Sequence, residues 1–294
     1  MGVDLGGTKI EVLVLDGGKE LMCDRVSTPS SYHEIISTIT SLISRVEESV
    51  KVECSIGICT PGSLSLTTGL LRNSNTTCLN KTPFKNDLEK SIGREIQIAN
   101  DANCFALSEA VDGAAQDVNS VFGVIVGTGT GAGLVVDKKV LVGCNFIAGE
   151  WGHNPLPWPN DGELSLTKCW CGQQGCIETF LSGPGLEEDY KRVTGESVGA
   201  EKIVELSEQG NEDAEQALLR YENRMARSLA HVINMFDPEI IVLGGGVSNL
   251  QRLYKNVPKL WQQWIFSDQI STKLLPPKYG DSSGVRGAAW LWND

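Results

Sequence analysis

Apolar residues along the chain fall into short runs and into longer segments with helical spacing. The short runs predict strands at residues 3–5, 10–16, 55–59, 96–99, 121–126, 134–137 and 240–243. Apolar residues three and four positions apart predict helices over residues 30–50, 200–208 and 213–236. Further helices are expected from residue 101 to about 115, after residue 249 and over residues 283–292. The apolar stripe of the first helix indicates packing against a core.

Two of the predicted strand pairs are joined by loops rich in glycine and threonine. Gly6-Gly7-Thr8-Lys9 follows the first strand, and a second loop spans residues 127–133 (GTGTGAG). Backbone N–H groups at such a strand end can bind a phosphate, although an ordinary glycine hairpin has the same pattern. The first loop is not a Walker A loop, and the second leads into a strand, whereas a dinucleotide-binding loop leads into a helix. The two copies of this strand–loop–strand pattern predict two similar lobes, each with a glycine hairpin that binds part of one triphosphate.

The segment over residues 149–178 gathers residue types that bind zinc. One histidine and three cysteines lie there: His153, Cys169, Cys171 and Cys176. Imidazole and thiolate suit Zn²⁺, and four protein ligands leave no open position for a catalytic water, so the site would be structural. Buried apolar cysteines or a redox dithiol are the alternatives, and a C-x-C pair alone would not exclude them. The third cysteine and the histidine favour zinc.

Asp101 follows a predicted strand, within Asn100-Asp101-Ala102-Asn103. An aspartate at the start of a helix is commonly its cap, and the same position suits a general base at the mouth of a cleft. The sequence leaves both interpretations open. Residues 60–75 and 244–249 form polar or glycine-rich turns that suit either a ligand pocket or an ordinary surface turn.

Composition narrows the range of partners. The chain has 294 residues, of which 41% are hydrophobic, so it can bury a large core, and we expect two lobes. Its net charge of −12 disfavours nucleic acid and anionic membranes as partners. A bound nucleotide would need backbone N–H groups, a few cations and a divalent metal. Nine cysteines without disulfide spacing, no signal peptide and apolar runs too short to cross a bilayer predict a cytoplasmic protein.

Three motifs together resemble the ROK family of bacterial sugar kinases and repressors. They are DLGGTK at 4–9, GEWGH at 149–153, and CWCGQQGC at 169–176 followed by Ile177-Glu178. The bacterial fructokinase (mannofructokinase) branch looks most similar, on NDANCFALSEAVDGAA at 100–115, GEWGHNPLPW at 149–158 and GDSSGVRGAAWLW at 280–292. The family's repressors carry an N-terminal winged helix, for which we expect no room here.

The resemblance implies an α/β fold of the actin/hexokinase-like (ribonuclease H-like) kind. This fold is duplicated into two lobes with an interlobe cleft, and a structural zinc loop is expected in addition. We expect residues 1–118 to form the N-terminal lobe and residues 119–282 the C-terminal lobe with the zinc-binding insert 149–178. The terminal helix, at about residues 283–294, is expected to pack back on the first lobe.

The resemblance also implies roles for single residues. Asp101 matches the catalytic base. The positions that match sugar contacts are Gly62, Ser63, Asn75, Asn100, Glu150, His153 and Glu178. Those that match the ATP side are Asp4, Gly6, Gly7, Thr8, Lys9, Gly127, Thr128, Gly129, Thr130, Gly131, Gly133, Gly245 and Gly246. Asp4 would hold Mg²⁺ through water. His153 would bind zinc through one ring nitrogen and a sugar hydroxyl through the other, so zinc would order the sugar-binding loop.

The leading hypothesis is an ATP-dependent hexose kinase that phosphorylates fructose, with mannose or glucose as further substrates, at the 6-hydroxyl. N-acetylglucosamine kinase and glucokinase are the alternatives within the family. A sugar-binding regulator without catalysis is the alternative outside enzymes, and Asp101 and the paired glycine loops disfavour it. We expect a hexose and ATP as partners, Mg²⁺ and structural Zn²⁺ as cofactors, and a homodimer.

Overall fold

The computed structural model describes residues 1–163 and 167–292 and divides into two compact units. The first unit comprises Met1–Asp117, Gly133–Ala148 and the segment from Lys278 onward; the second comprises Val118–Ala132 and Gly149–Pro277. Residues 164–166 of the predicted zinc insert and residues 293–294 of the predicted terminal segment lie outside the described residues. The lobe boundaries expected from the sequence stay a prediction.

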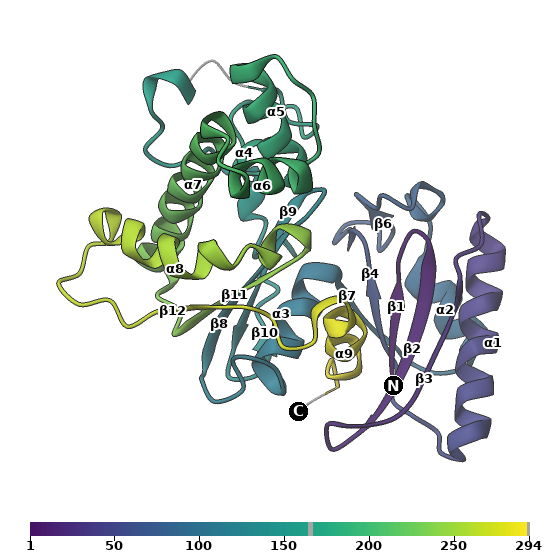
Figure 1. The fold of residues 1–294 in the computed structure, drawn as a ribbon. Coiled ribbons are helices and arrows are strands. Elements are labelled where there is room, and N and C mark those ends of the chain that lie inside the picture. Colours follow the sequence, from purple (N-terminus) through teal and green to yellow (C-terminus); the bar gives the residue numbers. More distant parts are fainter. Residues whose placement is uncertain (164–166, 293–294) are drawn as a thin grey trace. The chain divides into compact units, whose positions relative to one another are not determined.

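The first unit is built on a five-stranded sheet in the order β3-β2-β1-β4-β7 (Figure 1). Its strands are β1 (Gly2–Leu5), β2 (Lys9–Asp16), β3 (Lys19–Ser27), β4 (Gly57–Thr60) and β7 (Gln97–Asn100). β1, β2 and β3 form an antiparallel meander, and β4 lies parallel to both β1 and β7. The helices of this unit are α1 (Tyr32–Val50), α2 (Phe84–Ile92), α3 (Asp101–Val111) and α9 (Ser283–Ala289). A two-stranded sheet joins β5 (Ser63–Leu64) to β6 (Leu71–Arg72).

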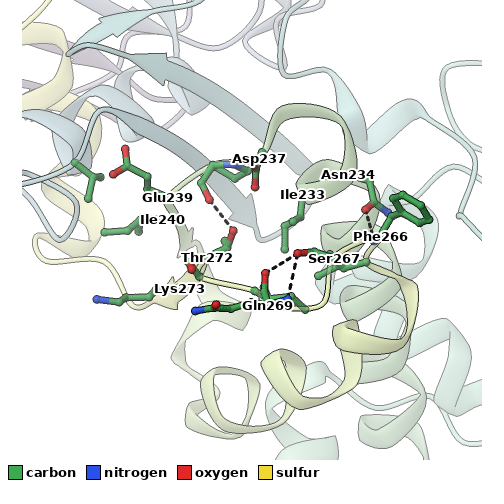
Figure 2. Close-up of a pocket in the computed structure, with 15 residues that line it drawn as sticks. Ile233, Asn234, Asp237, Glu239, Ile240, Phe266, Ser267, Gln269, Thr272 and Lys273 are labelled. Atoms are coloured by element: carbon green, nitrogen blue, oxygen red, sulfur yellow. Dashed lines mark hydrogen bonds between the residues drawn. The ribbon is translucent and has the colours of Figure 1, made fainter.

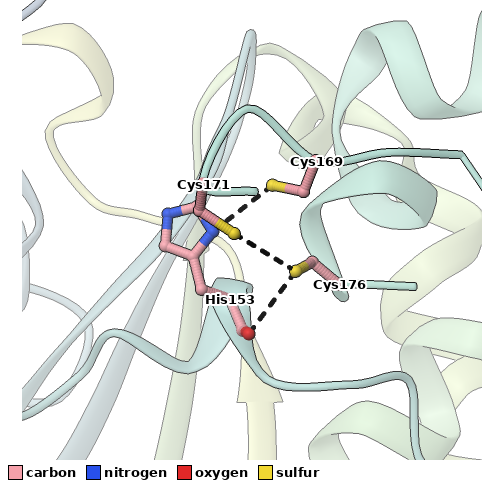
Figure 3. A group of neighbouring side chains, drawn as sticks. All are labelled: His153, Cys169, Cys171 and Cys176. Carbon is pink, nitrogen blue, oxygen red and sulfur yellow. Dashed lines mark hydrogen bonds between the residues drawn. The ribbon is translucent and has the colours of Figure 1, made fainter. Parts of the chain in front are cut away.

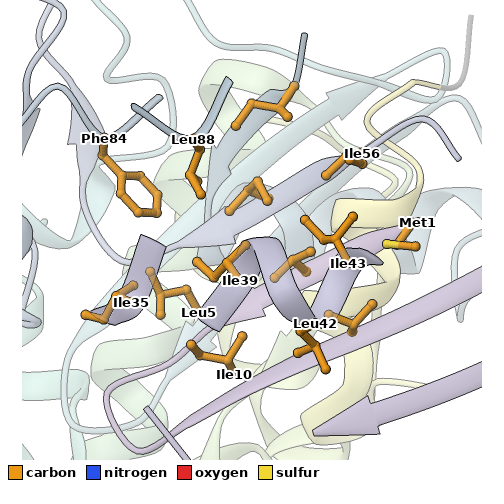
Figure 4. Packing of buried hydrophobic residues seen from close by; sticks show 14 of the residues in the cluster. Met1, Leu5, Ile10, Ile35, Ile39, Leu42, Ile43, Ile56, Phe84 and Leu88 are labelled. Atoms are coloured by element: carbon orange, nitrogen blue, oxygen red, sulfur yellow. The ribbon is translucent and has the colours of Figure 1, made fainter. Parts of the chain in front are cut away.

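Helix α1 forms because its apolar residues recur at helical spacing and both ends are capped. Ser31 accepts a hydrogen bond from the Glu34 backbone N–H, and Lys51 ends the helix in the left-handed conformation. The apolar face of α1 is buried against the sheet and α2, as Figure 4 shows for Ile35, Ile39 and Leu42. Burial of each such side chain contributes roughly 1.5–3 kcal/mol. This core holds the strand ends from which the candidate site residues project.

The second sheet repeats the order of the first, as β10-β9-β8-β11-β12. Its strands are β8 (Ser120–Val126), β9 (Thr130–Val136), β10 (Lys139–Val140), β11 (Ile240–Gly244) and β12 (Lys273–Leu275). β11 lies parallel to β8 and β12, just as β4 lies parallel to β1 and β7. The turns at residues 6–8 and 127–129 therefore occupy equivalent places in the two sheets. This repeat confirms the predicted duplicated α/β fold.

Helices dominate the rest of the second unit: α4 (Glu178–Leu181), α5 (Gly183–Thr194), α6 (Ala200–Glu208), α7 (Glu212–Phe236) and α8 (Gln251–Leu260). Short 3₁₀ turns at Trp151–His153, Asp161–Glu163 and Gly246–Asn249 carry several candidate site residues. Within the described residues, no helix combines the length and the apolar character needed to cross a membrane.

Candidate functional site

His153, Cys169, Cys171 and Cys176 converge on one point in the second unit (Figure 3). Their ligand atoms all lie within 4.8 Å of one another. Cys169 Sγ lies 3.6 Å from His153 Nδ1, and Cys171 Sγ lies 3.6 Å from Cys176 Sγ. Ligand atoms around a tetrahedral zinc ion are roughly 3.5–3.8 Å apart. The donor set and its spacing therefore fit Zn²⁺, and Nδ1 is the ring nitrogen of His153 that would bind it.

The three thiols of this cluster have different environments. Burial raises the pKa of Cys176 to about 12 and also raises the pKa of Cys169. Cys171 is exposed, and the nearby Gln173 backbone N–H lowers its pKa. Since zinc binds thiolates, metal binding would release protons from the two buried cysteines.

The zinc-binding segment is fastened to the turn between β8 and β9. Glu178 Oε2 accepts a hydrogen bond from the Thr130 backbone N–H at 3.0 Å, and its Oε1 accepts one from Trp170 Nε1 at 2.7 Å. Gly152 packs so closely on Thr130 that a Cβ atom there would lie 2.0 Å from the Thr130 carbonyl oxygen. The segment that carries the cysteines therefore contacts the second glycine loop directly, so the conformation of one constrains the conformation of the other.

The second glycine loop is shorter than the sequence predicted. The predicted span was 127–133, but β9 already begins at Thr130, because Gly131 and Gly133 are needed as strand residues. A Cβ atom on Gly133 would lie 2.6 Å from the Ala102 carbonyl oxygen, so this glycine permits β9 to pack against α3. Gly127, Thr128 and Gly129 form the turn itself.

A cavity of about 820 Å³ adjoins this turn within the second unit. Gly127 and Thr128 line it together with the first residues of α5 and α6 and with Gly246. The preceding residue, Gly245, has φ +82, and a Cβ atom there would lie 2.5 Å from the Val126 carbonyl oxygen. Backbone N–H groups at a turn and at helix starts are suited to phosphate groups. The cavity has the size of a small-molecule site.

The first glycine loop is a tight turn in the first unit. The Gly6 backbone N–H donates to the Lys9 carbonyl, while Gly7 and Thr8 are exposed. Lys9 is not free to meet a phosphate, since its Nζ is 3.0 Å from Glu11 Oε2. Asp4 lies on β1 just before the turn, and burial raises its pKa to about 6, with the neighbouring charge of Asp101 adding to the effect.

Asp101 is the first residue of α3, and Asn100 is its cap. Asn100 Oδ1 accepts the Asn103 backbone N–H at 2.8 Å, so the interpretation of Asp101 as the capping residue is wrong. Asp101 Oδ1 accepts the N–H of the next residue, Ala102, at 2.9 Å. Asp101 is exposed to solvent, yet the protein atoms crowded around its carboxyl disfavour the charged form and raise the pKa of Asp101.

The predicted sugar loop of the first unit follows β4. Gly62 has φ +87, and a Cβ atom there would lie 2.3 Å from the Arg72 carbonyl oxygen, so the turn requires glycine. Ser63 begins β5, and Asn75 is exposed in the next loop. Gly62, Ser63 and Asn100 line one cavity of about 520 Å³. In the second unit, Glu150 is exposed and immediately precedes the 3₁₀ turn that carries His153.

Comparison with known proteins gives the family. A sequence profile described as the ROK family matches residues 1–294. The chain belongs to the ROK family. It is 40% identical over 296 residues to the N-acetyl-D-glucosamine kinase of Aliivibrio salmonicida, covering 99% of this chain and 98% of the relative.

Two solved structures place the fold within the ROK family. The ROK hexokinase of Thermus thermophilus is similar with a TM-score of 0.89 and 30% identity, covering 99% of this chain and 96% of that one. A ROK glucokinase of Streptomyces griseus, solved with glucose and AMPPNP, is similar with a TM-score of 0.76 and 26% identity, covering 99% and 97%. The expectation of an ATP-dependent sugar kinase of the ROK family is confirmed. The fructokinase assignment is not supported.

A further cavity of this ROK protein contains none of the predicted site residues. It measures about 790 Å³ and lies in the second unit beside Phe266 (Figure 2). Several of its polar side chains bond within the wall. Asn234 Oδ1 accepts the Phe266 backbone N–H at 2.9 Å, and Thr272 Oγ1 donates to the Pro238 carbonyl at 2.7 Å.

Sequence reasoning overlooked two residues at the candidate sites. Trp170 lies between two zinc-binding cysteines, yet its indole contacts the His153 ring edge-on at 4.9 Å and donates to Glu178. Asn103 is buried beside the first-unit cavity. Its presence in the NDAN motif was the available signal, but only the fold shows that it is buried and belongs to a cavity wall.

Proposed function

We propose that this ROK protein transfers the γ-phosphoryl group of ATP to the 6-hydroxyl of N-acetyl-D-glucosamine. The full-length similarity to N-acetyl-D-glucosamine kinases, at 40% identity to that of Aliivibrio salmonicida, carries the proposal. This is the alternative that the sequence left open beside fructose. Identity spread over 99% of the chain supports the substrate more strongly than the short motifs that favoured fructokinase.

Asp101 is proposed as the general base. Asp101 is exposed and follows the end of a parallel strand, and its carboxyl accepts a hydrogen bond from the neighbouring Ala102 backbone N–H. The carboxylate would take the proton of the sugar hydroxyl while that oxygen bonds to the γ-phosphorus and the bond to the β-phosphate oxygen breaks. General-base catalysis typically contributes ~10²–10⁴-fold, and positioning and electrostatics would supply much of the rest.

The cavity of about 820 Å³ in the second unit is proposed to bind ATP, with the turn at residues 127–129 at its wall. Gly7 and Thr8 in the first unit and Thr128 in the second are exposed and are the proposed donors of backbone N–H groups to phosphate, whereas the N–H groups of Gly6 and Gly127 already donate within their turns. Gly246 would lie near the nucleoside. Asp4 supplies the carboxylate oxygen that suits a hydrated Mg²⁺, which when bound would neutralise phosphate charge. Lys9 has a smaller role than the sequence implied, because Glu11 holds its ammonium group.

The zinc-binding segment is proposed to position sugar contacts. Glu150, His153 and Glu178 retain oxygen or nitrogen atoms that can bind hydroxyl groups. Glu178 Oε1 accepts from both Trp170 Nε1 and the Cys169 thiol, whereas Oε2 accepts from the Thr130 backbone N–H and keeps a second lone pair for a hydroxyl group. Zinc, when bound, supplies structural cross-linking rather than a reactive water, because four protein ligands complete its shell.

The test is a coupled ADP-release assay with Mg-ATP and five sugars: N-acetylglucosamine, N-acetylmannosamine, glucose, fructose and mannose. The highest kcat/KM is expected for N-acetylglucosamine. Preference for fructose or glucose would overturn the substrate and keep the kinase. Sugar binding without ADP release on any of the five would overturn the kinase itself and favour the regulator.

A further inference from the structure

Trp170 has an orientation that hydrophobic packing does not explain. It lies between the zinc-binding residues Cys169 and Cys171, and 71% of it is exposed to solvent. An exposed indole gains little from burial, so its orientation is set by its polar and edge contacts. Two such contacts are present. Nε1 donates to Glu178 Oε1 at 2.7 Å, and the ring meets the His153 ring edge-on, with the centroids 4.9 Å apart. Trp170 thus contacts two of the residues proposed to bind the sugar.

The indole N–H is the stronger of the two donors to Glu178 Oε1. The other donor is the Cys169 thiol, whose sulfur lies 3.8 Å from the same oxygen. A thiol is a weak donor, and the Cys169 sulfur belongs to the zinc-binding set, so the metal engages it when bound. The 2.7 Å bond from Trp170 is short and joins an N–H group to a carboxylate, which makes it a strong hydrogen bond. Trp170 therefore supplies the main restraint on Oε1.

The Glu178 carboxylate needs a restraint on each oxygen to keep one orientation, because the terminal torsion of a glutamate side chain is broad. The Thr130 backbone N–H restrains Oε2, at 3.0 Å, and the indole of Trp170 restrains Oε1. Gly129 keeps space open beside Oε2, since a Cβ atom there would lie 2.9 Å from this oxygen. Its chain neighbours apart, that atom would have only Glu178 within 4 Å among the residues that the structure describes. Oε2 is thus held in one position, with room beside it for a hydroxyl group.

We propose that Trp170 is a positioning residue, whose indole N–H holds the Glu178 carboxylate so that Oε2 can accept a hydrogen bond from a sugar hydroxyl. Two zinc-binding cysteines flank Trp170, so bound zinc restrains the backbone from which the indole projects. Trp170 is thus the link through which the metal site orients Glu178. The inference rests on the proposed function and adds how one of its sugar contacts is held in place.

Two variants separate the N–H donor of Trp170 from its ring. Trp170→Phe keeps an aromatic ring without a donor, and Trp170→Gln keeps an N–H donor without a ring. We expect Trp170→Phe to raise both the calorimetric Kd and the KM for N-acetylglucosamine by roughly tenfold, while the zinc content and the KM for ATP stay unchanged. Trp170→Gln should bind the sugar more tightly than Trp170→Phe. The reverse order would assign the role to the ring and overturn the inference, as would wild-type binding in both variants.

Trp158→Phe is the matched control, because Trp158 is also exposed and lies in the same segment, residues 149–178. This variant should keep the wild-type Kd for N-acetylglucosamine and the wild-type zinc content. A rise in Kd as large as that of Trp170→Phe would show a general effect of altering the segment and would overturn the specific role of Trp170.

The link to the metal is tested by introducing Trp170→Phe into Cys171→Ser. The indole is expected to lose its fixed position together with the zinc, so the second substitution should raise the Kd for the sugar much less than it does alone. A further rise of the full size would contradict the link. Absence of both binding and turnover of N-acetylglucosamine in wild type would contradict the proposed function. Normal turnover in wild type with an unaffected Trp170→Phe variant would contradict this inference alone.

Discussion

At the scale of single residues, the pKa of the proposed base, Asp101, depends on the groups that surround its carboxyl. Asp101 lies at the positive end of α3, which by itself favours the charged form. The surrounding protein atoms outweigh this effect and raise the pKa of Asp101. A base with a raised pKa accepts a proton more readily, and it still ionises near neutral pH as long as its pKa stays below the pH of the assay.

Replacement of the base separates catalysis from folding. Asp101→Asn is expected to lower kcat by ~10²–10⁴-fold while the melting temperature at pH 7 stays equal or rises. Stability should not fall because a carboxyl with a raised folded-state pKa contributes stability at low pH and loses it as the pH rises through that pKa. Steady-state kinetics and thermal unfolding measure the two effects. A near-normal kcat would remove Asp101 as the base.

The pH profile is the control for this assignment. The acid limb of kcat/KM in wild type should lie above the ordinary aspartate pKa of 3.8, because protonation through the raised pKa removes the base. In Asp101→Asn the residual activity should lack this limb. An acid limb that persists in the variant would assign the titration to another group.

At the scale of elements, the zinc-binding segment links parts that are distant in sequence. It supplies His153 and Glu178, and it packs on Thr130 through Gly152 and through a hydrogen bond from the Thr130 N–H to Glu178. The residues proposed to contact the sugar and the turn proposed to bind phosphate are therefore held by the same segment. We expect loss of the metal to weaken binding of both ATP and the sugar, because the ligand-bearing segment positions the residues proposed to contact them.

Cys171→Ser tests this shared support. Cys171 is exposed, so the substitution removes a ligand with little change in packing. We expect loss of zinc by metal analysis and a rise in KM of roughly tenfold or more for both ATP and sugar. Cys144→Ser, also at an exposed cysteine, should retain zinc and both KM values. A rise in KM for the sugar alone would show that the contacts to Thr130 do not couple the cysteine segment to ATP binding.

The helices show which elements the sequence could reveal. The long α1 and α7 were predicted because their apolar stripes are long and regular. Helix α2 was missed because it is short, begins after Pro83 without a side-chain cap, and buries only Phe84 and Leu88. Helix α5 was missed because Gly183-Pro184-Gly185 suggests a turn, yet Ser182 caps it and the first turn packs against Gly127.

At the scale of the whole chain, the first unit contains both the N-terminal residues and the described residues 278–292. Helix α9 packs against β1, β4 and α3. Glycines at these contacts allow the backbones to approach more closely than any residue with a Cβ atom would permit. A Cβ atom on Gly287 would lie 1.7 Å from the Cys104 carbonyl oxygen, and one on Gly57 would lie 1.9 Å from that of Ala288. The last segment of the chain thus completes a unit that the first strand began.

Gly287→Ala should weaken this closure. Overlap with backbone atoms cannot be relieved by a side-chain rotation, so we expect the free energy of unfolding to fall by about 3 kcal/mol. Gly162→Ala, where a Cβ atom meets open space, should change it by less than about 0.5 kcal/mol. Denaturant titrations of the two variants give the comparison. Equal stabilities would mean that α9 moves aside at little cost.

The sequence by itself determined the features that depend on near neighbours. The zinc ligands lie in one segment, the glycine turns follow their strands directly, and the family motifs are contiguous, so spacing alone was enough. The tertiary structure decided the features that need distant partners. It made Asn100 the cap instead of Asp101, paired Lys9 with Glu11, and joined Glu178 to Thr130. Side-chain direction and burial arise only when the sheets and helices pack, and no local pattern encodes them.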